Sequence, residues 1–297
     1  MAGTDTLRIE TFALTALDIA AVDPAALHAL SVGVRWPHRA EDWRMLIAAG
    51  RGIAARDEIG RLIGTAMWFP YSEAFATVGM VITSPRLQAQ GAGRWLMEQA
   101  LAALGGRALG LNATRAARRL YRSLGFADEA TVYQCQGTAV RPEAAPPPPG
   151  TVLRAAEPAD LDALVRLDAQ AFGTPRSVLL PRLLAVSSGT VLLRAGRVEA
   201  FALCRPFGRG HVIGPLVAVC DADAVAVARP HVAARAGCFL RLDTRQRTGA
   251  FRAFVLGSGM PVHDTVTTMS RGRPWPVRGG ASGGMPATYA LTSQALG

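Results

Sequence analysis

The sequence predicts an α/β (α+β) protein built as two similar domains in tandem. A chain of 297 residues suits two domains of ordinary size. The same order of strand-like and helix-like patterns occurs in both halves, which indicates an internal duplication. Between the halves lies a proline-rich stretch at residues 141–150, whose consecutive prolines favour an extended spacer and stop either domain from continuing.

The duplication can be followed element by element. Residues 7–9 open the first half and residues 153–155 open the second, and each opening is followed by a helix-like apolar period. Two strands joined by a tight turn follow at residues 52–70 and again at residues 191–206. This correspondence predicts the same fold in both halves.

We place the boundaries by the composition of the chain. The first domain is expected at residues 1–138, the linker at 139–150, the second domain at 151–270 and a C-terminal tail at 271–297. With 50% hydrophobic and 18% charged residues, the chain can bury a sizeable core and is not expected to be disordered.

A glycine-bearing turn opens a predicted helix in the first half. Residues 88–93 read Gln-Ala-Gln-Gly-Ala-Gly, between a strand pattern at 78–83 and an amphipathic helix pattern at 94–104. Gly91 and Gly93 allow the backbone to come close to a bound phosphate. The unpaired N–H groups and the positive dipole end of the helix then face the anion. Taken alone, the pattern is more typical of a plain strand–turn–helix connection.

A second segment lies shortly after this helix. Residues 111–114 predict a short strand, and residues 120–126, Leu-Tyr-Arg-Ser-Leu-Gly-Phe, predict the end of a helix of about ten residues with a glycine stop. Together the two segments resemble the Gcn5-related N-acetyltransferase (GNAT) family, and the resemblance covers residues 7–137. It implies a central mixed, mostly antiparallel sheet flanked by helices in each half.

The resemblance also implies a site for acetyl-CoA as co-substrate. In the family the glycine-bearing turn holds the pyrophosphate, the preceding strand binds pantetheine and polarises the thioester carbonyl, and a tyrosine protonates the departing thiolate. Tyr121 is the implied catalytic acid. The implied cofactor-binding residues are Val81, Ile82, Thr83, Gln88, Ala89, Gln90, Gly91, Ala92, Gly93, Arg94 and Asn112.

The acceptor side is less defined by the sequence. Trp36, His38 and Glu41 lie between the first two predicted helices, a region that faces substrate in the family, and Glu73 is a further candidate. His38, Glu41 and Glu73 are alternative general bases, and a water chain is another route. As an alternative, Glu41 and Asp42 cap or decorate the second helix while Trp36 and Trp43 pack.

The second half lacks the features that bind CoA in the first. Residues 221–230 stand where the glycine-bearing turn would be and contain two carboxylates but no glycine, and Val255 aligns with Tyr121. The arrangement resembles a bacterial GNAT subgroup with a catalytic N-terminal domain and a divergent C-terminal copy. Further resemblance lies in residues 36–43, 214–218 and 289–297.

The net charge of +10 comes with 32 basic residues, all of them arginine. Their scatter indicates a solvated surface, with help for anionic CoA as a second interpretation, so we do not expect a nucleic-acid partner. The widely spaced cysteines predict no metal site. No signal peptide or membrane span is evident, so we expect a cytoplasmic protein without a membrane partner. A homodimer is compatible with the sequence.

These inferences converge on an acetyl-CoA-dependent N-acetyltransferase. The acceptor is expected to be a primary amine of a small molecule or peptide, which attacks the thioester directly. The alternative is a non-catalytic module that binds acyl-CoA and serves regulation.

Overall fold

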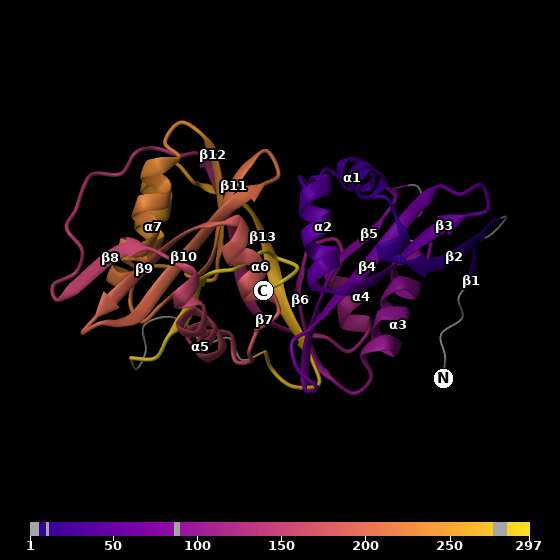
Figure 1. The fold of residues 1–297 in the computed structure, drawn as a ribbon. Coiled ribbons are helices and arrows are strands. Elements are labelled where there is room, and N and C mark those ends of the chain that lie inside the picture. Colours follow the sequence, from indigo (N-terminus) through magenta and orange to yellow (C-terminus); the bar gives the residue numbers. More distant parts are fainter. Residues whose placement is uncertain (1–5, 10–11, 86–89, 276–283) are drawn as a thin grey trace.

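The computed structural model describes residues 6–9, 12–85, 90–275 and 284–297. Strands and helices alternate in both halves of the chain (Figure 1). The helices of the first half are η1 (Ile19–Ala21), α1 (Pro24–Gly33), α2 (Ala40–Ala49), α3 (Ala92–Leu104) and α4 (Arg118–Ser123). Its strands are β1 (Thr6–Ile9), β2 (Phe12–Asp18), β3 (Arg51–Asp57), β4 (Leu62–Pro70), β5 (Phe75–Thr83), β6 (Ala108–Ala113) and β7 (Ala127–Thr138).

The second half repeats this order. Its helices are η3 (Pro158–Asp160), α5 (Leu161–Phe172), α6 (Leu179–Val186), α7 (Asp221–Ala234) and α8 (Ala250–Gly257). Its strands are β8 (Thr151–Ala155), β9 (Ser188–Arg194), β10 (Arg197–Phe207), β11 (Gly210–Ala218), β12 (Phe239–Thr244), β13 (Val262–Arg271) and β14 (Ala287–Ala290).

One continuous sheet runs through both halves. The strand order is β1-β2-β3-β4-β5-β6-β13-β7-β12-β11-β10-β9-β8, and β14 pairs with β11 off this path. Adjacent strands are antiparallel except for β5 with β6 and β11 with β12, which are parallel. The predicted fold class, two tandem copies of a mixed and mostly antiparallel sheet flanked by helices, is confirmed.

The two halves exchange their long C-terminal strands. Strand β7 belongs to the first half by sequence, yet it pairs with β12 and β13 of the second half. Strand β13 in turn pairs with β6, where Thr268 lies opposite Asn112. The strands before and after the boundary expected at residue 138 therefore belong to one sheet. Through this exchange, a strand of the second half lies next to β6 of the first.

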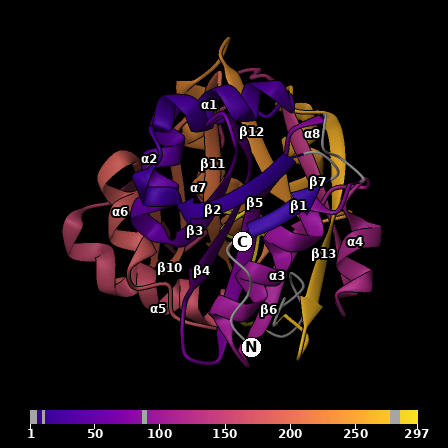
Figure 2. The same ribbon diagram turned by 90° about the vertical axis from the view of Figure 1, so that its right-hand side faces the viewer.

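Helices cover both faces of this sheet (Figure 2). Helices α2 and α6, one from each half, pack together, and Trp43 and Leu183 belong to one buried apolar cluster. Helix α3 packs on β4 and β5, and α7 packs on β9, β10 and β11. The halves are thus joined both by the sheet and by a shared core.

Two local details differ from the sequence-based expectation. The counterpart of β8 is β2 and not residues 7–9, because β2 pairs with β3 as β8 pairs with β9. Helix α4 has 6 residues instead of the expected ten. It is shorter because the chain first makes a turn in which the carbonyl of Thr114 accepts from the N–H groups of Ala117 and Arg118.

Candidate active site

Strands β5 and β6 separate part way along their length. They pair from Phe75 opposite Ala108 only as far as Thr77 opposite Gly110. Just beyond this point the register between β4 and β5 shifts, and Met80 has a φ of 51°. The Thr65 hydroxyl donates to the Met80 carbonyl at 2.7 Å and fixes this bulge. The result is an opening in the sheet, bordered on one side by residues 79–83 and on the other by residues 111–113.

The start of α3 lies at one side of this opening. Gly91 is the N-terminal cap of the helix, with a φ of 90° that favours glycine, and a Cβ added to it would meet nothing within 4 Å. Gln90, Gly91 and Arg94 are exposed, Ala92 is buried and Gly93 is half-buried. Gln88 and Ala89 lie outside the described residues. An exposed helix start with a left-handed glycine can present its N–H groups to an anion.

Helix α4 brings Tyr121 next to this turn. The Arg94 guanidinium donates to the Ser123 hydroxyl at 2.7 Å, which ties the first turn of α3 to α4. Tyr121 is 6% exposed and lies edge-on to Phe126, with 6.0 Å between the ring centroids. Burial raises the pKa of the Tyr121 phenol well above its usual value. The hydroxyl therefore stays protonated and able to donate a hydrogen bond.

Asn112 lies on the other border of the opening, where the second half reaches it. Its Nδ2 donates to the Gln294 carbonyl at 2.8 Å, and its Oδ1 accepts from the Thr268 hydroxyl at 2.8 Å. Both ends of the amide are thus held by the C-terminal half. The contact between Asn112 and CoA that the family resemblance implies stays a prediction.

The last residues of the chain enter the same opening. The Thr77 hydroxyl donates to the Ala295 carbonyl at 3.1 Å. A Cβ added to Gly79 would lie 2.6 Å from the Ala295 Cβ, so only glycine allows this close approach. Leu296, the next residue, is anchored as well. Its carbonyl accepts hydrogen bonds from the Tyr71 hydroxyl at 2.8 Å and from buried Arg176 at 3.2 Å. We refer to residues 292–297 as the C-terminal segment.

A cavity of about 180 Å³ lies between the two halves at this place. Its walls come from the α1–α2 loop, the β5 bulge, the end of β6, the C-terminal segment and strands β7, β10, β11, β12 and β13. The wall residues on which the arguments below depend are Trp36, His38, Gly79, Met80, Asn112, Phe207, Arg241 and Asp243.

His38 is the predicted acceptor-side residue with the most distinctive environment. Its ring lies edge-on to Phe207, with 5.3 Å between the centroids, and its Nδ1 is buried without a hydrogen-bond partner in the described part of the chain. Burial, reinforced by the positive charge of Arg241, lowers the pKa of His38 to about 4. The imidazole is therefore neutral at physiological pH and can accept a hydrogen bond.

Of the other predicted acceptor-side residues, one lines the cavity and two do not. Trp36 lines the cavity beside His38, with 5.8 Å between the ring centroids. Glu41 and Glu73 do not line it. Glu41 pairs with Arg44 on the outer side of α2, and Glu73 is 98% exposed and pairs with Arg107.

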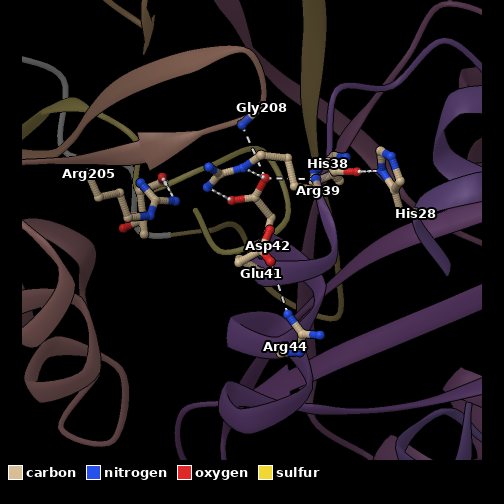
Figure 3. Close-up of polar contacts among 9 residues, drawn as sticks. His28, His38, Arg39, Glu41, Asp42, Arg44, Arg205 and Gly208 are labelled. Carbon is tan, nitrogen blue, oxygen red and sulfur yellow. Dashed lines mark hydrogen bonds and ion pairs between the residues drawn. The ribbon is translucent and has the colours of Figure 1, made fainter. Parts of the chain in front are cut away.

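A polar clasp holds the α1–α2 loop against the second half (Figure 3). Asp42 accepts two hydrogen bonds from the Arg39 side chain and one, at 3.1 Å, from the backbone N–H of Gly208. The hydrogen bonds from Arg39 and Gly208 hold the pKa of the Asp42 carboxyl below its usual value despite its burial. The sequence-based alternative that an acidic residue caps α2 is correct for Asp42, which also accepts from the Arg39 N–H.

Sequence reasoning missed the residues that the second half contributes. Phe207, Arg241 and Gln294 lie far from the first half in sequence, and no local motif marks them. Only the strand exchange and the course of the C-terminal segment bring them to the cavity.

The equivalent opening in the second half is filled by the chain itself. Strands β11 and β12 pair only at His211–Val212 and then separate, and β14 pairs with β11 beyond this point. The Leu291 N–H donates to the Asp243 carbonyl of β12 at 2.8 Å and closes the gap. A pantetheine arm would therefore meet β14 here.

The first turn of α7 is also unlike that of α3. Its Asp221 accepts from the Phe251 N–H at 3.0 Å and from the Tyr289 hydroxyl at 3.1 Å, and Asp223 pairs with Arg194. These carboxylates occupy the helix start and would repel a pyrophosphate. Val255, aligned with Tyr121, is fully buried.

Two further findings concern the described ranges only. They contain no group of three or more His, Cys, Asp or Glu side chains that could hold a metal ion. No helix in them is both long and apolar enough to cross a membrane.

Comparison with known proteins identifies the fold and the family. The sequence matches family profiles described as "Acetyltransferase (GNAT) domain" at residues 48–128 and again at residues 164–280. The chain belongs to the GNAT acetyltransferase superfamily and contains two such domains in tandem. This class of protein transfers an acyl group from acyl-CoA to an acceptor.

Solved structures share the whole arrangement at low sequence identity. A protein from Pyrococcus horikoshii classed as an acetyltransferase has a TM-score of 0.73 at 18% identity, covering 95% of this chain and 96% of its own. A GCN5-related N-acetyltransferase from Sphaerobacter thermophilus has a TM-score of 0.61 at 17% identity, covering 92% and 98%. A tandem GNAT protein from the clavulanic acid biosynthesis pathway has a TM-score of 0.60 at 12% identity, covering 86% and 98%. No match was found among curated proteins.

Proposed function

We propose that this protein is an acetyl-CoA-dependent N-acetyltransferase whose single catalytic centre is the opening between β5 and β6. The observation that carries the proposal is the convergence of three features on that opening: the left-handed Gly91 at the start of α3, the bulge at Met80 and the protonated Tyr121. In the second half these features are replaced by Asp221, β14 and Val255.

The chain's own residues have separate tasks in this proposal. The N–H groups that follow Gly91 bind the pyrophosphate of acetyl-CoA. The freed edge of β5, with Val81 and Ile82, pairs with the pantetheine arm as an added strand does. A backbone N–H at the bulge then polarises the thioester carbonyl while its oxygen gains charge.

The acceptor enters from the cavity between the halves. A primary amine attacks only as the free base, because an alkylammonium of pKa about 10 has no lone pair. Neutral His38 accepts a hydrogen bond from this amine and orients it, while its lowered pKa makes it too weak a base to remove the ammonium proton alone. Water in the cavity relays that proton to bulk solvent, so the free amine is the form that attacks. The amine nitrogen bonds to the carbonyl carbon, the C–S bond breaks, and Tyr121 donates its proton to the departing thiolate. The nitrogen then loses its extra proton to water, and the tyrosinate takes up a proton from solvent.

The second candidate function is a non-catalytic acyl-CoA-binding module. The exposed positions of Glu41 and Glu73 favour it, since neither carboxylate is placed to serve as a general base in the cavity. The two functions differ in one measurable quantity, the release of free CoA.

The test is thiol release from acetyl-CoA across a panel of primary amines, with the acetylated product identified by its mass. Amine-dependent release with a matching mass gain of 42 Da, roughly one acetyl group in place of hydrogen, is expected. Tight binding of acetyl-CoA with no release above the hydrolysis background for any amine would favour the regulatory module instead. We also expect a cytoplasmic protein of bacterial type, as the sequence indicates.

A further inference from the structure

Two arginine side chains, Arg241 and Arg205, lie at one wall of the cavity between the halves. Arg241 lines the cavity from β12, and Asp243 binds its Nε at 2.9 Å and its Nη2 at 2.6 Å. The remaining nitrogen, Nη1, makes no hydrogen bond to another described residue, so its two N–H groups are left for a ligand.

A second guanidinium lies beside the first on the same face of the sheet. Arg205 of β10 is in register with Val212, and Val212 is in register with Arg241. Residues in register on neighbouring strands point to the same face. Both guanidinium groups contact the Phe207 ring, at 5.7 Å for Arg205 and 5.5 Å for Arg241 from the centroid.

Arg205 forms no ion pair with a carboxylate in the described part of the chain. It is 2% exposed, its Nη2 donates to the Thr292 carbonyl at 3.0 Å, and its Nη1 is buried with no hydrogen-bond partner among the described residues. Nearby Asp42 is already engaged by Arg39 and Gly208 (Figure 3). Burial of this unpaired charge lowers the pKa of Arg205 to about 10.

The charges on this wall therefore do not balance. Arg241 lines the cavity, and Arg205, which does not line it, is buried next to Arg241 against the same Phe207 ring, so two guanidinium groups lie beside one carboxylate, that of Asp243. The other charged groups of the lining, Arg35 and Asp264, are exposed at the mouth and have opposite signs. Burying an uncompensated charge is costly unless a counter-charge arrives. The wall thus has the electrostatic form of an anion subsite.

Size limits the acceptor further. A cavity of about 180 Å³ holds roughly six water molecules at the volume each occupies in the liquid. The C-terminal segment forms one side of it through Ser293, Gln294 and Ala295. An extended peptide would need a groove that continues past the reacting amine.

We propose that the acceptor is a small amine that carries a carboxylate, such as a free amino acid, with the carboxylate bound by Arg241 and the amine directed to the β5 bulge beside His38. This inference rests on the proposed acetyltransferase function. The apolar faces of Trp36 and Phe207 would then cover the acceptor's side chain.

The test compares acceptors that differ only in the carboxylate. Free L-amino acids, their α-carboxamides, the matching decarboxylated amines, 1,4-diaminobutane and short peptides are assayed for thiol release with acetyl-CoA. The proposal predicts the highest kcat/KM for a free amino acid, by at least 10-fold over its amide. A preference for the amide, the diamine or a peptide would overturn it while leaving the acetyltransferase function intact. No release with any amine would instead contradict the proposed function.

Variants of Arg241 and Asp243 test directly whether this subsite binds the acceptor's carboxylate. Arg241→Gln should raise KM for the amino acid about 10- to 100-fold, the range for a lost charged hydrogen bond, with little change in kcat or in the rate with the amide. Because this change strands buried Asp243, the paired variant Arg241→Gln with Asp243→Asn keeps a neutral hydrogen-bonded pair and should show the same loss. Arg229→Gln, on the outer side of α7, is the matched control. An unchanged ratio of amino acid to amide in the folded paired variant would refute the subsite.

Discussion

A hydrogen bond joins Asn112 of β6 to Gln294 of the C-terminal segment. The Asn112 side chain, at the border of the opening between β5 and β6, donates to the Gln294 carbonyl at 2.8 Å, although the two residues are 182 positions apart. The C-terminal segment, which contains Gln294, follows shortly after the end of β14 at Ala290. One stretch of chain therefore closes the opening of the second half and completes the wall of the opening in the first.

Asn112→Asp should detach this contact. The change replaces the Nδ2 donor by a carboxylate oxygen that repels the Gln294 carbonyl, while the Thr268 hydroxyl can still donate to the other oxygen. We expect KM for the acceptor to rise at least several-fold and the free energy of unfolding to fall by about 1–3 kcal/mol. Calorimetry should show nearly unchanged CoA affinity. A loss of CoA affinity with unchanged acceptor KM would assign Asn112 to the cofactor instead.

Gly91→Glu should abolish CoA binding. A non-glycine residue at a φ of 90° is strained by about 1–2 kcal/mol, and the added carboxylate would face the pyrophosphate. Gly105→Glu is the matched control, because Gly105 ends the same helix, also has a positive φ, and has open space for a side chain. Both variants should fold, and only the first should lose affinity in a titration with CoA. Equal affinities would remove Gly91 from the site.

Tyr121→Phe should bind acetyl-CoA almost normally and lose kcat. The phenylalanine keeps the edge contact with Phe126 and removes only the proton donor. A loss of ~10–10³-fold in kcat is expected, because water can partly replace the donor. Since burial raises the pKa of Tyr121, the wild-type rate should show no loss from its ionisation up to pH 10. Tyr289→Phe, which removes the hydroxyl bonded to Asp221 in the second half, should lower stability but not kcat. Full activity of Tyr121→Phe would make this residue a packing residue.

Acid should destabilise the protein through its buried histidines. His231 is 3% exposed, and burial lowers its pKa to about 4 from an ordinary value of 6.5. The unfolded chain takes up this proton near pH 6.5 but the folded chain only near pH 4, so stability falls as the pH falls through that interval. The loss for this one group is on the order of 3 kcal/mol. Urea unfolding of wild type and His231→Gln at pH 4.5 and pH 7 measures it. An equal pH dependence in the variant would show that His231 is not responsible.

Features that depend on a few neighbouring residues could be predicted from the sequence. The glycine-bearing turn marked the start of α3, and the repeated strand–turn–strand pattern marked β3–β4 and β9–β10, because turn chemistry and apolar periodicity act over a few residues. The family resemblance supplied the topology of each half. It also singled out Trp36 and His38, and both line the cavity between the halves.

What the sequence could not reveal depends on contacts between distant segments. The exchange of β7 and β13 leaves the pattern of either strand unchanged, since each pairs on both edges in any case. Arg241 and Phe207 lie in ordinary strand patterns and gain their role only because the halves share one sheet. Glu41 and Glu73 had suitable chemistry, but their solvent-exposed ion pairs could not be inferred from residue type.

The central claim, that the first half alone binds acyl-CoA, is tested most directly by the stoichiometry of CoA binding to the whole chain. Isothermal titration calorimetry should give one site per chain, because β14 and the carboxylates of α7 block the second opening. The same titration of Gly91→Glu should give none. Two sites per chain, or one site that persists in Gly91→Glu, would contradict the account.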